Sequence, residues 1–175
     1  MPVQSTVPTL TVTRPEVYDR LVKIPSLENM LERSLGVDRS KAVYMGVTDS
    51  PVAFAPRMLE RIPITQGGKE GYYWRSYDFF FKGTAERALK TGDTSFANGR
   101  SVSQLIAGEF IFSLPNGFQA YMLSGFGTQH RYDALANVAR DGRREDKLVI
   151  NGESCITCHA RGLNVRRDEI RPRFE

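Results

Sequence analysis

The chain has few of the residues that mark several large classes of protein. Its 175 residues include two cysteines and two histidines, too few for a disulfide framework or for a cysteine- and histidine-rich metal cluster. No stretch reaches the roughly 18 apolar residues that a membrane helix requires, so no transmembrane segment is predicted. Lys and Arg number 24 against 20 Asp and Glu, and opposite charges alternate in the C-terminal part. That pattern is typical of a solvated surface and does not favour nucleic-acid binding.

The composition predicts an ordinary globular protein. Apolar residues make up 41% of the chain and charged residues 25%, and the length suits a single domain over residues 1–175. Residues 1–13 are rich in Thr, Val and Pro and are predicted to form an extended N-terminal arm. The N-terminus lacks a charged segment followed by an apolar one, so no signal peptide is predicted.

The residues with the most distinctive chemistry lie together in the segment Cys155-Ile156-Thr157-Cys158-His159. The spacing C-x-x-C-H is that of covalent haem attachment in c-type cytochromes. On a helix the two cysteines lie about one turn apart on one face, so each thiol can bond to one vinyl group of the same porphyrin. The adjacent histidine then provides an axial ligand to the iron. The segment predicts one covalent haem c, held by Cys155 and Cys158, with His159 as the proximal iron ligand.

Three other uses of the cysteine pair fit the sequence less well. A thioredoxin-like redox pair requires a strand before it and a long helix after it, and the sequence indicates neither. A tetrahedral zinc site needs four ligands, and outside the motif only His130 is available. A disulfide across two intervening residues closes a very small loop and stabilises little. Haem attachment is therefore the favoured interpretation.

Periodicity along the chain predicts an α+β fold. Apolar residues recur at helical spacing over residues 15–22 and 27–35, which predicts two short N-terminal helices. The segment from Glu109 to Leu123 predicts a β-hairpin around Pro115-Asn116-Gly117, since the glycine supplies the positive φ that such a turn needs. The expected architecture has short N-terminal helices, a small antiparallel β-rich core that includes this hairpin, and a C-terminal haem-attachment helix from Ser154 to Gly162.

Three segments, residues 74–79, 108–123 and 151–162, resemble a mono-haem c-type cytochrome domain of exported bacterial proteins, in which the CxxCH motif is C-terminal. The resemblance spans about residues 15–163. It implies haem binding and a periplasmic or extracellular location. Because no signal peptide is present, such a segment is expected to have been removed or not included.

The sixth iron ligand must come from upstream of the motif. Only 16 residues follow His159, and none of them is His or Met. Met122 is the preferred distal ligand, since it ends a strand of the predicted hairpin, and the alternatives are Met58, Met45 and His130. A thioether opposite the histidine raises the potential and suits electron transfer. A vacant distal position would instead admit a diatomic gas or peroxide.

The leading functional hypothesis is a one-electron carrier that exchanges electrons with a redox partner protein, because the sequence shows no evident catalytic apparatus. Arg161 is a candidate partner for a haem propionate. The second hypothesis is a five-coordinate haem that binds gas or acts as a peroxidase, with His130, Glu109 or Arg75 as distal acid–base group. The third is a docking domain of a larger exported protein, in which haem mainly stabilises the core.

Overall fold

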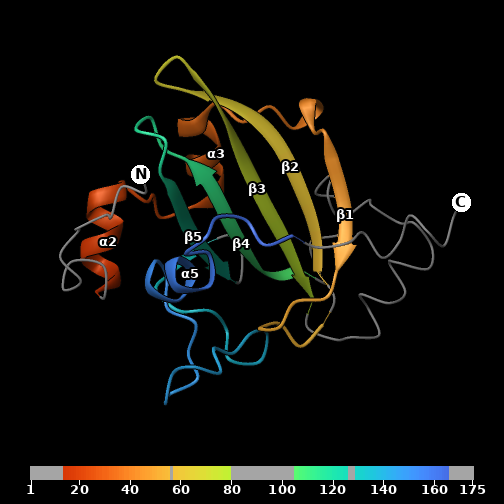
Figure 1. Cartoon of the computed structure of the whole chain (residues 1–175), viewed down its shortest axis with the longest axis vertical. Coiled ribbons are helices and arrows are strands. Elements are labelled where there is room, and N and C mark those ends of the chain that lie inside the picture. Colours follow the sequence, from red (N-terminus) through yellow and green to blue (C-terminus); the bar gives the residue numbers. More distant parts are fainter. Residues whose placement is uncertain (1–13, 56, 80–104, 126–128, 166–175) are drawn as a thin grey trace, which may run out of the picture.

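The computed structural model describes residues 14–55, 57–79, 105–125 and 129–165 (Figure 1). The arm predicted for residues 1–13 lies outside this part. The described residues form one antiparallel sheet in which every strand pairs with the next along the chain, in the order β1-β2-β3-β4-β5-β6. The strands are β1 (Tyr44–Thr48), β2 (Arg57–Gln66), β3 (Lys69–Phe79), β4 (Leu105–Ser113), β5 (Gln119–Gly125) and β6 (Gln129–Arg131). The helical elements are α2 (Pro15–Val22), α3 (Glu28–Leu35), the 3-10 turn η1 (Arg39–Lys41) and α5 (Glu153–Cys158).

The α+β prediction is wrong, because the described part of the chain is mostly β. Five strands have between 5 and 11 residues, and β6 adds three more. The two predicted N-terminal helices are present as α2 and α3, but each has only eight residues. The predicted C-terminal haem-attachment helix is not seen, and its place is taken by α5, which has only six residues. Short amphipathic helices of this length cannot form a layer of their own, so they cover parts of the sheet.

The C-terminal helix also begins and ends elsewhere than predicted. Its N-cap is Gly152, and it ends before His159 rather than at Gly162. Ser154, predicted as the cap, instead accepts a hydrogen bond on its hydroxyl from the Ile150 N–H at 3.0 Å. This contact fixes the loop that leads into the helix.

The predicted β4–β5 hairpin is confirmed. Phe110 pairs with Met122 and Phe112 with Ala120, and Gly117 has φ of 86° in the connecting turn. A second hairpin, β2–β3, was not predicted. Proline has no backbone N–H to donate in a sheet, so Pro63 argued against a continuous strand at this position. Pro63 nevertheless lies in β2, opposite Tyr72.

Alternation along the strands gives the sheet two different faces. On the first, which we call the α3 face, Tyr73, Phe110 and Met122 are buried with Leu31 and Leu35 of helix α3 in the main core cluster. The residues between them in the strands point to the other side, towards α5, and we call this the α5 face (Figure 1). Among the described residues, no helix is both long and apolar enough to cross a membrane.

Candidate functional site

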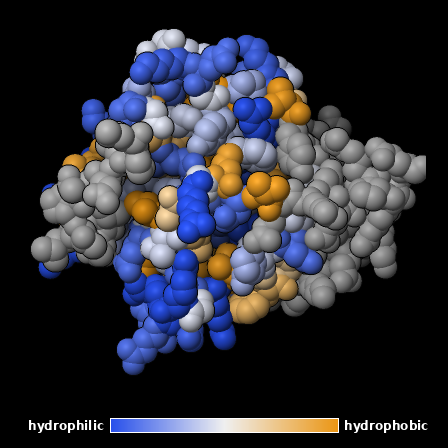
Figure 2. Space-filling model, viewed as in Figure 1, coloured by the Kyte–Doolittle hydropathy of each residue, from blue (hydrophilic) through white to orange (hydrophobic). Residues whose placement is uncertain are grey.

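A pocket of about 400 Å³ lies on the α5 face. Its walls include Leu59, Trp74 and Ile111 from the sheet, and Cys155, Cys158 and His159 from α5 and its C-terminal end. The volume falls within the roughly 300–1,000 Å³ that is usual for small-molecule and cofactor pockets. Figure 2 shows apolar residues near the centre of this side of the molecule, among hydrophilic ones.

Helix α5 brings both cysteines to this pocket. Cys155 and Cys158 are free thiols that line it, whereas Ile156 between them is exposed. Cys155 also packs against the apolar cluster that contains Leu123. Burial raises the pKa of the Cys155 thiol well above its usual value, so this thiol is protonated at neutral pH. The pair presents two unoxidised sulfur atoms on one face of a short helix.

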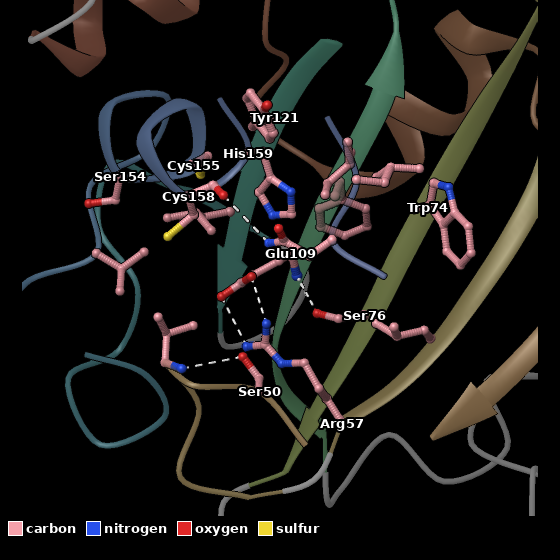
Figure 3. A pocket seen from close by; sticks show the side chains of 18 of the residues that line it. Ser50, Arg57, Trp74, Ser76, Glu109, Tyr121, Ser154, Cys155, Cys158 and His159 are labelled. Atoms are coloured by element: carbon pink, nitrogen blue, oxygen red, sulfur yellow. Dashed lines mark hydrogen bonds and ion pairs between the residues drawn. The ribbon is translucent and has the colours of Figure 1, made fainter. Parts of the chain in front are cut away.

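His159 follows the helix and lines the same pocket (Figure 3). Its Nδ1 lies 3.2 Å from the Gly162 carbonyl oxygen, which can only accept, so Nδ1 carries the proton and Nε2 is left with a free lone pair. The ring packs on Tyr121, with 5.8 Å between the ring centroids. A histidine fixed in this way through one nitrogen has the usual arrangement of a metal ligand that binds through the other.

Helix α2 holds the segment that leads into α5. The Tyr18 hydroxyl accepts a hydrogen bond from the Tyr121 N–H at 2.6 Å, and Asp19 accepts one from the Asn151 side chain at 2.9 Å. Gly152 has φ of 77°, and a Cβ at that position would meet the Tyr18 ring at 2.7 Å. The close approach of α2 therefore depends on glycine, and it fixes where the cysteines stand relative to the sheet.

A buried ion-pair cluster borders the pocket on its sheet side. The Arg57 guanidinium forms two hydrogen bonds with Glu109, at 2.7 and 3.0 Å, and an ion pair with Asp78 at 2.9 Å. The Ser76 hydroxyl accepts from the Glu109 N–H at 2.9 Å and so fixes the backbone at that position (Figure 3). One cation thus serves two carboxylates from neighbouring strands.

The two carboxylates of this cluster differ in their pKa values. Burial raises the pKa of Asp78 to about 7, although Arg57 opposes the shift. Burial acts on Glu109 in the same direction, but the charge and hydrogen bonds of Arg57 outweigh it, and the pKa of Glu109 lies below its usual value. At neutral pH Glu109 is therefore ionised, whereas Asp78 is protonated in part of the molecules.

The structure does not bring the preferred distal ligand together with His159. Met122 is among the residues that line the pocket, but its side chain is fully buried in the α3-face cluster with Leu31 and Phe110, so it lies across the sheet from the histidine. Met58 pairs with Tyr77 and has the same orientation. Successive side chains of a strand point to opposite faces of the sheet, and Met122 points to the face opposite His159. The hairpin prediction did not consider which face Met122 would occupy.

The remaining candidates are also placed elsewhere or lie outside the description. Both ring nitrogens of His130 are engaged, Nδ1 with the Leu123 carbonyl oxygen at 3.0 Å and Nε2 with Asp19 at 2.5 Å. Met45 lies in β1, and its side chain is not among those described. Of the predicted acid–base groups, Arg75 and Glu109 both border the pocket, but the Arg75 guanidinium is bound by Glu28 and Glu32 of α3, whereas Glu109 lies on the α5 face.

The predicted propionate partner, Arg161, is exposed to solvent after the end of α5. The cation that contacts the motif is Arg143, which donates a hydrogen bond to the Cys158 sulfur and also bonds Asp141. Neither the role of Arg143 nor the pairing of Arg57 with Asp78 was predicted from the sequence. For Asp78 the available signal was a charged residue within an aromatic-rich strand, where a buried charge needs a partner.

The donor set of this pocket fits a covalently attached haem. It offers two free thiols one helical turn apart, an imidazole with one free nitrogen, and a largely apolar wall on the sheet side. In the described part of the chain, no group of three or more His, Cys, Asp or Glu side chains is arranged to hold a metal ion without a porphyrin. Comparisons with protein-family models, with curated proteins and with solved structures found no match.

Proposed function

We propose that the chain is a mono-haem c-binding domain, with Cys155 and Cys158 as attachment residues and His159 as the proximal iron ligand. The observation that carries the proposal is that Cys155, Cys158 and His159 all border one pocket. In the sequence, only the CxxCH spacing connects these three residues. The location that goes with this attachment chemistry is outside the cytoplasm, periplasmic or extracellular.

The residues of the pocket have distinct parts in holding such a group. The cysteines would provide two covalent bonds, and the Gly162 carbonyl engages Nδ1 of His159, which leaves Nε2 as the nitrogen that would bind the iron. Leu59, Trp74 and Ile111 line the pocket, and apolar walls of this kind would favour binding of a large apolar macrocycle by keeping water from its surface. When bound, haem supplies an iron centre that exchanges single electrons or binds a small molecule.

The geometry favours the five-coordinate hypothesis over a carrier with two protein ligands. Apart from Met1 and Met45, whose side chains are outside the description, every Met and His other than His159 is either on the α3 face, exposed, or engaged through both ring nitrogens. The function supported best is therefore binding of a small molecule at the iron.

One-electron transfer is the second candidate, and a separate observation favours it. Leu163 and Val165 border the pocket and are 39% and 95% exposed. Apolar side chains at the pocket mouth would let a redox partner protein approach the edge of a bound ring.

Mass spectrometry under denaturing conditions tests the attachment. The wild-type chain, made in a host able to attach haem, should carry the mass of one haem, while Cys155→Ala and Cys158→Ala should retain haem through a single bond or lose it. Only the apo mass in the wild-type protein would contradict the proposal.

Absorption spectra with and without carbon monoxide separate the two functions. Rapid binding of carbon monoxide to the reduced wild-type protein, with no ligand-replacement phase, is expected for the five-coordinate form. Slow or absent binding would instead support the electron carrier, and Met45→Ala would then identify whether Met45 is the sixth ligand.

A further inference from the structure

Only one of the two carboxylates bound to Arg57 can be reached from the pocket. The Glu109 side chain is 25% exposed and lines the pocket, whereas the side chains of Arg57 and Asp78 are 7% and 3% exposed. Two other carboxylates border the pocket, but Asp49 is exposed to solvent and Asp141 is bound by Arg143. Glu109 is thus the buried anionic group that a molecule in the pocket would meet.

Glu109 has hydrogen-bonding capacity to spare. Arg57 uses one acceptor position on each carboxylate oxygen, at 2.7 and 3.0 Å. An ionised carboxylate has about four such positions, so one remains on each oxygen. The Ser76 hydroxyl accepts a hydrogen bond from the Glu109 backbone N–H and does not occupy the carboxylate oxygens.

Arg57 keeps this group in the form that accepts hydrogen bonds. Burial would raise the pKa of Glu109, but the charge and hydrogen bonds of Arg57 hold it below its usual value. Glu109 is therefore an acceptor without a proton of its own at neutral pH.

We propose that Glu109 is the specificity-determining residue of the pocket, and that the pocket takes small neutral or cationic molecules bearing an N–H or O–H donor. This inference rests on the proposed haem function. Leu59 and Ile111 offer such a donor no partner, and the pocket's hydroxyl and amide groups are neutral, so the charged carboxylate of Glu109 is the strongest acceptor a ligand would meet. Anions are repelled by the same charge, and ligands without a donor gain nothing from it.

Two ligands that differ by one donor test the proposal. Imidazole and 1-methylimidazole both bind ferric haem through nitrogen, but only imidazole keeps an N–H. In the wild-type protein, imidazole should bind more tightly by roughly 10-fold or more, the usual size of a hydrogen bond to a charged group. Dissociation constants are read from the Soret band. Equal affinities in the wild-type protein would overturn the inference without any variant.

Matched substitutions locate the effect. Glu109→Gln should reduce the preference for imidazole to a small factor and should tighten the binding of cyanide, an anion. Asp78→Asn removes a charge from the same Arg57 on the side away from the pocket, and it should keep the wild-type preference, as should the exposed Glu70→Gln. If Asp78→Asn shifts the preference as much as Glu109→Gln, the carboxylate is not a direct partner and the inference fails.

The failure of this inference differs from the failure of the proposed function. A wild-type chain with only the apo mass would overturn both. A chain that carries haem and binds both imidazoles equally well would leave haem attachment intact and overturn the role of Glu109.

Discussion

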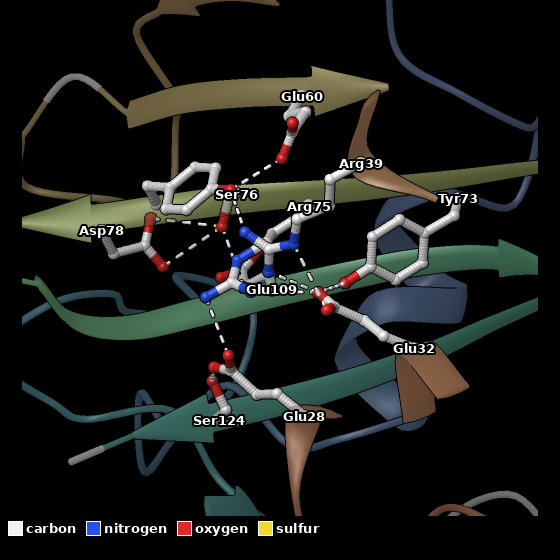
Figure 4. Close-up of polar contacts among 11 residues, drawn as sticks. Glu28, Glu32, Arg39, Glu60, Tyr73, Arg75, Ser76, Asp78, Glu109 and Ser124 are labelled. Carbon is white, nitrogen blue, oxygen red and sulfur yellow. Dashed lines mark hydrogen bonds and ion pairs between the residues drawn. The ribbon is translucent and has the colours of Figure 1, made fainter. Parts of the chain in front are cut away.

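Each face of the sheet buries one arginine between two carboxylates, but the two clusters are built differently. On the α3 face, Arg75 binds Glu28 at 2.7 Å and Glu32 at 3.1 Å, both from helix α3 (Figure 4). Its guanidinium also lies over the rings of Tyr77 and Phe110, at 4.6 and 5.3 Å from their centroids. On the α5 face, the partners of Arg57 are Asp78 and Glu109, which come from the neighbouring strands β3 and β4.

The origin of the partners decides what each cluster does. Because Glu28 and Glu32 belong to the helix, the ion pairs of Arg75 join the helix to the sheet, and aromatic and aliphatic side chains fill the space around them. Because Asp78 and Glu109 belong to the sheet, the cluster of Arg57 needs nothing from α5, and the space towards that helix stays open as the pocket. The α3 face stabilises the fold, and the α5 face carries the candidate site.

The largest expected difference between the faces is in the cost of truncating a core side chain. Phe110→Ala should lower the free energy of unfolding by about 3–5 kcal/mol, because it opens a cavity among filled neighbours. The adjacent Ile111→Ala should cost clearly less, since Ile111 is only partly buried and lies on the α5 face, whereas Phe110 is packed in the core of the α3 face. Urea unfolding of the two variants measures both values. Equal costs would mean that the α5 face is packed as tightly as the other.

The difference between the two faces of the sheet could be predicted from the sequence only in part. The β4–β5 hairpin could be predicted, because its turn residues and strand-favouring side chains are local signals. The full length of β2 could not be predicted, since Pro63 suggests that the strand ends there. Only the pairing with β3 shows that it continues through Pro63. The same holds for Arg57, whose partners lie 21 and 52 residues along the chain in other strands (78 − 57 and 109 − 57).

The candidate site was predicted in part for a similar reason. The CxxCH spacing is local, so its three residues could be named, and the structure brings them to one pocket. The distal ligand depends on which face of a distant strand points to the histidine. A shift of the strand by one residue would turn each side chain to the other face of the sheet. The sequence alone does not show whether Met122 faces α5 or α3.

Met122→Ala tests the assignment of Met122 to the α3 core. The substitution should lower the free energy of unfolding by about 2–5 kcal/mol, the usual cost of truncating a fully buried methionine. It should leave the absorption spectra of the oxidised and reduced haem protein unchanged, because the thioether lies on the other side of the sheet. A new five-coordinate or water-bound spectrum in this variant would restore Met122 as the axial ligand.

The cluster on the α5 face should also make stability depend on pH. Since burial raises the pKa of Asp78 to about 7, the folded protein keeps a proton that the unfolded chain releases near its ordinary pKa. Unfolding therefore releases this proton between about pH 4 and pH 7, and the free energy of unfolding falls as pH rises through that range, by at most about 1.4 kcal/mol per pH unit.

Asp78→Asn should remove this slope, whereas the exposed control Glu70→Gln should keep it. Chemical denaturation at several pH values between 4 and 8 gives the comparison. A slope that survives in Asp78→Asn would assign the proton to another group of the folded protein.

The smallest expected effect separates the two arginines near α5, Arg143 and Arg161. Arg143 donates to the Cys158 sulfur, so its charge lies next to the site, whereas Arg161 is exposed to solvent beyond the helix. A nearby positive charge stabilises the reduced iron, which carries one positive charge less. Arg143→Gln should therefore lower the midpoint potential by a few tens of millivolts, and Arg161→Gln by clearly less. Potentiometric titration at low and high salt measures both shifts, and high salt should shrink them because both side chains are accessible to ions. A larger shift for Arg161→Gln would instead support Arg161 as the propionate partner that the sequence predicts.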